Sequence, residues 1–293
     1  MKPIPEMHPF DVHFHVGAHK TATTYLQWTL RNNSELLSQN NIKYFGPQDM
    51  RHPNFSIKDC FEFQNDETKT PEEMSYPTKL MIFSDENMLK SVQDKNHTGH
   101  PSFYPHRTEV LTDFLQSFSG RKVRVFLGIR DTAGFFASYY SQKLVAGHVG
   151  SFDVFRKKSA FDDARWSDVV KSFLKFQDID EIIVWQYENY MQVLPLILGK
   201  LLNEEIGKQI RILSEPLHVG LSEKAIQVIL AEKQEKGKVT REFTRQVREN
   251  YPKSRRHPAP VLWTSSEMRG SHRRYEADVK EISCLDKVTL LNV

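Results

Sequence analysis

Residues 11–25 read DVHFHVGAHKTATTY. An apolar run from Asp11 to Val16 that ends in polar residues predicts a strand. A small-residue turn follows, and a threonine-rich segment then begins a helical pattern. Backbone N–H groups at such a turn, together with the partial positive charge of a helix N-terminus, form a cradle for an anion. The segment therefore predicts an anion-binding loop at the end of a strand.

The same alternation of strands and helices continues along the chain. Further strands are predicted at residues 79–83, 122–129 and 181–185, and helices at 23–37, 132–145, 167–176 and 191–202. Ser222 begins a capping pattern before a last helix at 225–231. This order predicts an α/β fold with a central parallel sheet flanked by helices. Ligands bind at the carboxyl ends of strands in such sheets, so functional residues are expected there.

The length of 293 residues suits a single domain spanning 1–293. An irregular insertion is expected at about 46–78, and a basic C-terminal arm or lid at about 234–293. Forty basic residues nearly cancel 37 acidic ones, so bulk charge does not indicate a nucleic-acid partner. The two cysteines favour neither a disulfide framework nor a metal site. No apolar run is long enough to span a membrane, and a cytoplasmic protein is expected.

The loop differs from the nucleotide-kinase pattern G-x-x-x-x-G-K-[ST]. Counting from Gly17, the second glycine falls on Ala22 and the lysine on Thr23. The lysine that would reach a γ-phosphate is therefore absent from its place. Lys20 lies three residues earlier and supplies a positive charge, while Thr23 and Thr24 supply hydroxyl donors.

The order Lys20-Thr21-Ala22-Thr23-Thr24 resembles the 5′-phosphosulfate loop of the sulfotransferase family, Lys-[Ser/Thr]-Gly-Thr-Thr. Ala22 replaces the glycine, which costs about 1 kcal/mol if that position has a positive φ. The resemblance implies a P-loop-NTPase-like three-layer sandwich and the donor 3′-phosphoadenosine 5′-phosphosulfate (PAPS), without a metal. It also implies that the whole loop binds this donor: Gly17, Ala18, His19, Lys20, Thr21, Ala22, Thr23 and Thr24.

A second anchor follows the strand at 122–129. Arg130 and Ser138 are eight residues apart, so that an arginine leaving a strand and a serine in the next helix can converge on one phosphate. In sulfotransferases a similar pair binds the 3′-phosphate, which distinguishes PAPS from ATP. Tyr187 resembles the family's tyrosine near the adenine ring, where an aromatic face stacks on a purine.

The resemblance implies transfer of a sulfuryl group to a hydroxyl or amine, with Lys20 stabilising the leaving oxygen. The acceptor, a small molecule or a glycan, stays unidentified, as does the oligomeric state. A general base is required, and Glu86 is the first candidate, followed by Asp85 and His19. Burial would have to raise the pKa of Glu86. His13 and His15 are expected to be residues of the sheet faces.

Two other functions stay open. Residues 80–86 also resemble a Walker B strand, with Asp85 near Mg²⁺, which would suit a nucleotide-dependent kinase. The third reading is a nucleotide-binding module without catalysis. The C-terminal contacts of the nucleotide are not recognisable, although Arg255 and Arg256 could supply them.

Overall fold

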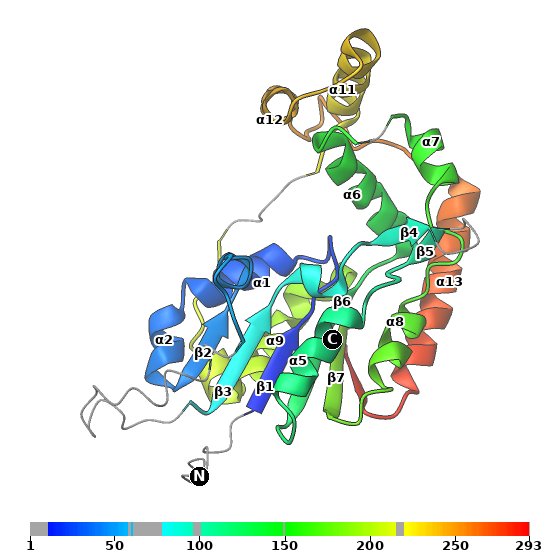
Figure 1. Cartoon of the computed structure of the whole chain (residues 1–293). Coiled ribbons are helices and arrows are strands. Elements are labelled where there is room, and N and C mark those ends of the chain that lie inside the picture. Colours follow the sequence, from blue (N-terminus) through cyan, green and yellow to red (C-terminus); the bar gives the residue numbers. More distant parts are fainter. Residues whose placement is uncertain are drawn as a thin grey trace.

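The computed structural model describes residues 11–57, 60, 78–95, 101–148, 150–214 and 220–292. Its central sheet has the strand order β2–β3–β1–β6–β7–β8, and every neighbouring pair is parallel (Figure 1). The strands are β1 (Asp11–His15), β2 (Ile42–Phe45), β3 (Leu80–Ser84), β6 (Val123–Ile129), β7 (Ile179–Gln186) and β8 (Val288–Leu291). A short antiparallel pair, β4 (Gln93–Lys95) with β5 (Pro101–Phe103), lies outside this sheet.

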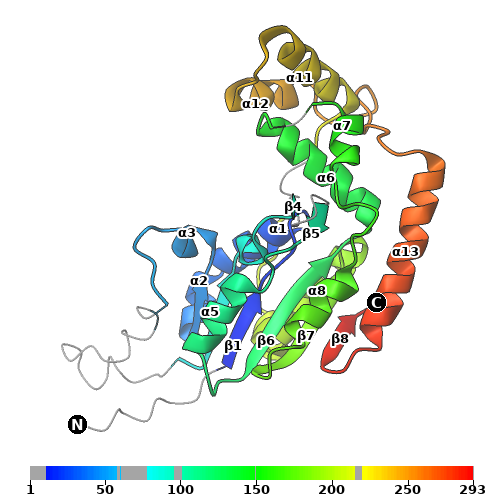
Figure 2. The same ribbon diagram turned by 45° about the vertical axis from the view of Figure 1, so that its right-hand side comes forward.

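Helices cover both faces of the sheet (Figure 2). One face packs against α1 (Thr23–Arg31), α2 (Ser34–Gln39), α9 (Tyr190–Leu202) and α10 (Glu204–Gly207). The other packs against α5 (Glu109–Ser117), α8 (Trp166–Phe173) and α13 (Ser265–Ser283), and α6 (Thr132–Val145) joins the same apolar cluster. The predicted α/β fold, three layers with a central parallel sheet, is confirmed.

The side chains of β1 show how the two faces differ. Val12 and Phe14 point into one apolar cluster. His13 and His15 point to the other face, where their Nδ1 atoms lie 2.8 Å from the carbonyl of Leu201 and 2.7 Å from the hydroxyl of Ser84. Burial lowers the pKa of both histidines to about 4, so they are neutral at physiological pH. Both are sheet-face residues, as predicted.

The predicted helix at 23–37 is wrong as a single element, because it is broken between α1 and α2. The side-chain amide of Asn33 donates to the carbonyls of Thr29 at 2.8 Å and Arg211 at 3.0 Å. Asparagine competes in this way with the backbone bonds of a helix. After α2, Asn41 turns the chain with φ 61° into β2, a strand that the sequence did not predict.

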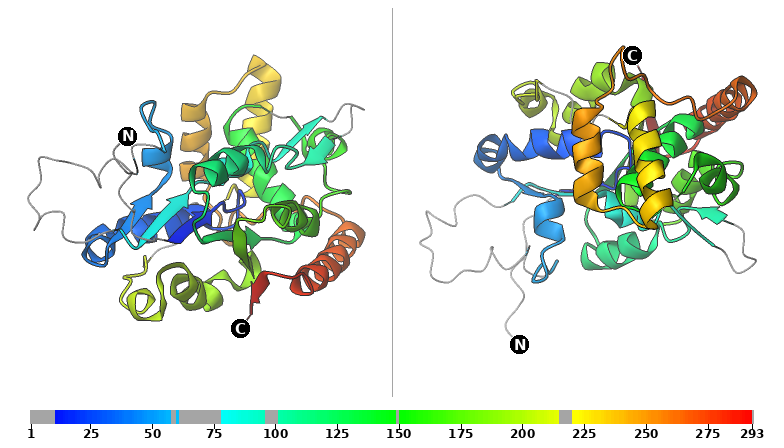
Figure 3. Two further views of the ribbon diagram at one scale, coloured as in Figure 1. Left: turned by 60° about the horizontal axis from the view of Figure 1, so that its bottom comes forward. Right: turned by 90° about the horizontal axis from the view of Figure 1, so that it is seen from above.

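The C-terminal region is not a simple basic arm, and that prediction is wrong for its second half. Asp278 of α13 accepts hydrogen bonds from the backbone N–H groups of Trp166 and Ser167 on α8, and β8 is the sixth strand of the sheet. Only α11 (Glu223–Lys236) and α12 (Arg241–Asn250) project from the body, above α6 (Figure 3).

Little of the predicted insertion can be compared with the structure. It holds the short helix α3 (Pro47–Met50), and most of its later part lies outside the described residues. In the described part of the chain, no helix is long and apolar enough to cross a membrane.

Candidate functional site

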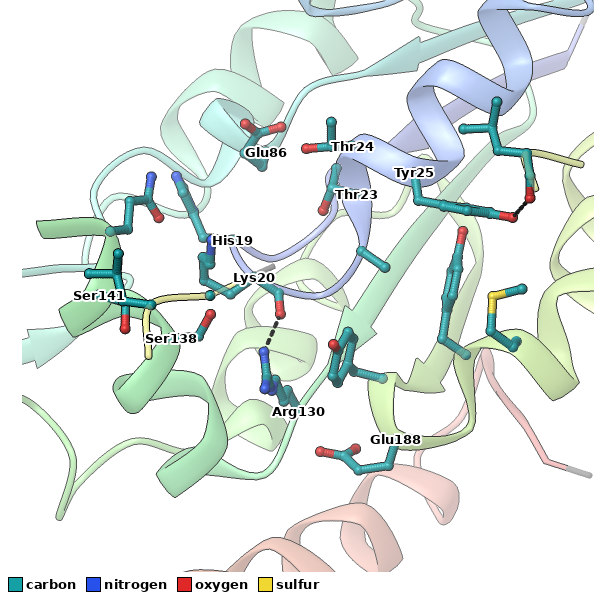
Figure 4. Close-up of a pocket in the computed structure, with 18 of the residues that line it drawn as sticks. His19, Lys20, Thr23, Thr24, Tyr25, Glu86, Arg130, Ser138, Ser141 and Glu188 are labelled. Carbon is teal, nitrogen blue, oxygen red and sulfur yellow. Dashed lines mark hydrogen bonds between the residues drawn. The ribbon is translucent and has the colours of Figure 1, made fainter. Parts of the chain in front are cut away.

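A cavity of about 870 Å³ lies at the carboxyl ends of β1, β3, β6 and β7 (Figure 4). Strands β1 and β6 are neighbours, but the helices that follow them, α1 and α6, pack in the apolar clusters on opposite sides of the sheet. This arrangement opens a crevice at the carboxyl ends of the two strands. Nine of the residues predicted from sequence line this cavity: His19, Lys20, Ala22, Thr23, Thr24, Glu86, Arg130, Ser138 and Tyr187. Gly17, Ala18, Thr21 and Asp85 do not line it.

The loop after β1 has an uncommon backbone conformation. Gly17, Lys20 and Ala22 have φ values of 42°, 65° and 64°. A Cβ atom on Gly17 would lie 2.8 Å from the side chain of Thr23, so glycine is required there. Lys20 and Ala22 lack the freedom of glycine, and each costs about 1 kcal/mol in this region. Strained backbone of this kind is concentrated at ligand sites.

The loop leaves backbone donors free at the start of α1. Ala22 is the N-cap, and no side chain caps the helix. The N–H groups of Thr23 and Thr24 donate to no acceptor among the described residues, so they are free for an anion. The hydroxyl of Thr23 instead donates inward to the carbonyl of Ala18 at 3.0 Å, as does that of Thr21 at 2.7 Å. Thr24 is therefore the one threonine of the predicted pair whose hydroxyl proton remains for a ligand.

Lys20 forms no salt bridge with any described residue, although it lines the cavity. Its carbonyl accepts a hydrogen bond of 2.9 Å from Nη1 of Arg130, which joins the tips of β1 and β6. Burial lowers the pKa of Lys20, and the charges of Arg130 and Arg248 lower it further, against the opposing effect of Glu86. Lys20 is half-buried, and a cation of this kind whose cationic neighbours disfavour its charge gains more than an exposed one from an anionic ligand.

Arg130 is held on three sides. Its guanidinium lies 4.1 Å from the centre of the Tyr187 ring, at the end of β7. A Cβ atom on Gly134 would lie 3.3 Å from its Nε, so the glycine of α6 allows this approach. The indole of Trp166 donates to the Arg130 carbonyl at 2.7 Å. Burial lowers the pKa of Arg130, and the fork remains charged because the ordinary value is so high.

The sequence did not indicate that α13 supports this anchor. Asp131 caps α6, and its carboxylate accepts a hydrogen bond of 3.0 Å from the Ser271 hydroxyl. Glu188 accepts from the N–H of Asp131 at 2.9 Å and from the hydroxyl of Tyr275 at 3.0 Å. Both α13 residues lie more than 80 positions from their partners, so no local pattern could reveal them.

The two carboxylates at the end of β3, Asp85 and Glu86, have partners that suit neither a kinase nor a general base with a raised pKa. Arg51 binds Asp85 through two hydrogen bonds of 2.8 and 2.6 Å, and it reaches Glu86 at 3.0 Å. Gln27 donates to the other oxygen of Glu86 at 3.1 Å. Burial acts to raise the pKa of Glu86, but the hydrogen bonds outweigh it and the pKa is lowered. Glu86 is therefore an ionised carboxylate that lines the cavity, and its pKa is lowered rather than raised, so it can accept a proton but is a weaker base than the sequence predicts.

His19 lies beside Lys20 in the same wall (Figure 4). The buried hydroxyl of Tyr104 lies 3.1 Å from both the backbone N–H and Nδ1 of His19. Because it accepts from the N–H, this hydroxyl can donate to Nδ1, which leaves the ring proton on Nε2. Burial lowers the pKa of His19, against the opposing charges of Glu86 and Asp85, so the ring is neutral at physiological pH.

An aromatic end of the cavity escaped sequence analysis. Tyr25 and Tyr190 meet edge to face with ring centres 5.9 Å apart, and Tyr25 donates to the carbonyl of Leu213 at 2.5 Å. Met191 and Tyr187 line the same cavity. Tyr187, which follows β7, was predicted from the sequence. The other residues come from α1, from the start of α9 and from the segment after α10, so only the fold brings them together. In Figure 4, Tyr25 lies on the side of the cavity away from Ser138 of α6.

The C-terminal cation in the cavity is neither Arg255 nor Arg256, which are both exposed. Arg248 of α12 lines the cavity instead. Its place in the cavity could not be predicted from the sequence. Charged residues are frequent throughout 234–275, and no motif distinguishes Arg248 from them.

No family model matches this chain, and no curated protein matches it. A solved structure from work on the PezAT chromosomal toxin–antitoxin system of Streptococcus pneumoniae is similar at 11% identity, with a TM-score of 0.27, over 93% of this chain and 88% of that one. A TM-score this low supports no conclusion about function.

Proposed function

We propose that this chain is a sulfotransferase that moves a sulfuryl group from PAPS to a hydroxyl or amine of an acceptor. One observation carries the proposal: two separate anion anchors, the loop after β1 and Arg130 with Ser138, line a single cavity. A nucleotide with phosphates on both its 5′ and 3′ positions needs two such anchors, whereas ATP needs one continuous cradle.

The residues suit this ligand in a specific orientation. The free N–H groups of Thr23 and Thr24, with Lys20, would hold the 5′ end. Arg130 and Ser138 would hold the 3′-phosphate. Tyr25, Tyr187 and Tyr190 would surround the adenine, since aromatic faces stack on any base.

The transfer breaks the bond between sulfur and the oxygen that bridges to the 5′-phosphate. The acceptor oxygen or nitrogen forms a new bond to sulfur, and adenosine 3′,5′-bisphosphate leaves with the bridging oxygen. Lys20 neutralises the charge that develops on this oxygen, which is the main task of a protein in a loose, in-line transfer. The proton of the acceptor passes to a base on the cavity wall.

The base is tested at Glu86, with His19 as the alternative. We expect Glu86→Gln to lower the maximal rate about a hundredfold or more and to leave nucleotide affinity nearly unchanged. Glu86 accepts protons only when ionised, and its pKa is lowered, so the wild-type rate should fall only below pH 4.5 as the carboxylate is protonated. An unchanged rate in Glu86→Gln would exclude this residue and make His19→Asn the next variant to measure.

A kinase is the second candidate, and two features disfavour it. Thr23 occupies the position of the kinase lysine. Asp85, the carboxylate that would approach Mg²⁺, is bound on both oxygens by Arg51 and does not line the cavity. A module without catalysis would keep the anchors but show no transfer.

Calorimetry with adenosine 3′,5′-bisphosphate and with ATP separates these candidates. We expect the bisphosphate to bind at least about tenfold more tightly than ATP, without a requirement for Mg²⁺, since an arginine–phosphate pair contributes this much. Tighter, Mg²⁺-dependent binding of ATP would reject the sulfotransferase proposal. A screen of acceptors with labelled donor then distinguishes an enzyme from a binding module.

A further inference from the structure

The hairpin of α11 and α12 brings a cation to the cavity from the C-terminal part of the chain (Figures 1 and 3). Arg248 is half-buried and lines the cavity, and it forms no ion pair with any residue that the structure describes. Arg245, less than one turn earlier on α12, is exposed and pairs with Glu242 at 2.8 Å. The two arginines share a helix but have different surroundings.

The hairpin is attached where it can hold Arg248 in place. Thr244 is fully buried, and its hydroxyl donates to the carbonyl of Val145 at the end of α6, at 3.1 Å. Lys233 of α11 donates to the carbonyl of Gly147 at 2.9 Å. The Ser222 hydroxyl donates to the carbonyl of Tyr251 at 2.7 Å, which ties the two ends of the hairpin together. Arg248 follows Thr244 by four residues and lies on the same side of α12.

The position of Arg248 links it to the loop lysine. Both side chains line one cavity, and the charge of Arg248 acts on Lys20. Val145 and Gln142 of α6 line the cavity as well. Neither side chain forms an ion pair with a described residue, although the charge of Glu86 also acts on Lys20. The repulsion between the two cations is relieved when an anion lies between them. The loop N–H groups and Lys20 account for one anionic group, so Arg248 is available for another.

We infer that Arg248 binds the outermost anionic group of a ligand whose inner phosphate lies in the loop after β1. The inference rests on the proposed function, in which that group is the sulfuryl group to be transferred. Arg248 would then hold the sulfuryl oxygens from the hairpin side while Lys20 faces the bridging oxygen. An anionic acceptor bound by Arg248 is the competing assignment, and the test below separates the two.

The test compares two ligands that differ in the outer group. Adenosine 3′,5′-bisphosphate lacks the sulfuryl group and PAPS carries it. Calorimetry without acceptor gives the affinity of each for the wild type, for Arg248→Gln and for Arg245→Gln. We expect Arg248→Gln to weaken PAPS binding by about tenfold or more, with less than about a threefold change for the bisphosphate. Arg245→Gln, the matched control, should change neither affinity.

Each other outcome overturns the inference. Equal losses for both ligands would place Arg248 on a group that they share. Unchanged affinities would place it against the acceptor or solvent. In both cases the proposed function stands, because the wild type still binds the bisphosphate. A wild-type protein that binds neither ligand overturns the proposed function and the inference together. Retained binding of the bisphosphate by Arg248→Gln also shows that this variant is folded.

Discussion

Replacing Lys20 with alanine is expected to lower the transfer rate by about a hundredfold or more and to weaken adenosine 3′,5′-bisphosphate binding by about tenfold. Lys20 lines the cavity and forms no ion pair with a described residue, so its ammonium group is available to an anionic ligand. The rate should fall more than the affinity, because the charge on the leaving oxygen grows in the transition state. Single-turnover rates and calorimetry measure the two effects separately.

The control for this variant is another lysine with a positive φ. Lys90 has a φ of 57°, lies outside the cavity and pairs with Glu109 at 3.2 Å. Lys90→Ala makes the same chemical change at another position with a positive φ, and its rate and affinity should match the wild type. Near-normal turnover in Lys20→Ala would remove this lysine from the mechanism. Equal losses in both variants would indicate a general effect on folding.

The parts of the site that lie close together in the sequence were predictable. The loop at residues 17–24 combines a strand end, small residues and threonines within eight positions, and all these signals are local. Arg130 directly follows a strand and Ser138 lies about two turns into the next helix, so their spacing alone predicts that they converge. The positive φ of Ala22 was likewise foreseen as a cost, since that position matches a glycine in the loop pattern.

The parts that depend on tertiary contacts were not predictable. Arg51 comes from the segment after β2, and nothing local shows that it neutralises Asp85 and lowers the pKa of Glu86. The pKa of a carboxylate reflects its burial and partners, which an adjacent pair of acidic residues does not reveal. Arg248 was hidden for a similar reason, because exposed arginines surround it in the sequence and only the attachment of α12 to α6 selects it.

Arg130 has one structural role and one proposed role, and its variant must separate them. It holds the loop through the carbonyl of Lys20, and it faces the cavity as the proposed partner of the 3′-phosphate. Loss of the first role would weaken every ligand of the loop. Loss of the second would weaken only ligands with a 3′-phosphate. The affinity for one ligand therefore cannot separate the two roles. The ratio of the affinities for a ligand with and a ligand without the 3′-phosphate can separate them.

We expect Arg130→Ala to weaken adenosine 3′,5′-bisphosphate by about a hundredfold and adenosine 5′-phosphate by about tenfold or less, since a charged fork contributes up to about 3 kcal/mol per bond. Calorimetry with both ligands measures the ratio. Arg124→Ala is the matched control, because Arg124 lies at the other end of β6 and pairs with Glu181 at 3.3 Å. It should change neither affinity.

The ratio also decides between the candidate functions. If Arg130→Ala weakens both ligands equally, Arg130 only supports the loop, and no second anchor for a 3′-phosphate remains beyond Ser138. The cavity would then select a 5′-phosphate alone, which is the requirement of a kinase or of a general nucleotide-binding module. A selective loss of the bisphosphate places positive charge at the 3′ position. Discrimination there separates PAPS from ATP, because the two donors differ in the phosphate on that position as well as in the group that they transfer.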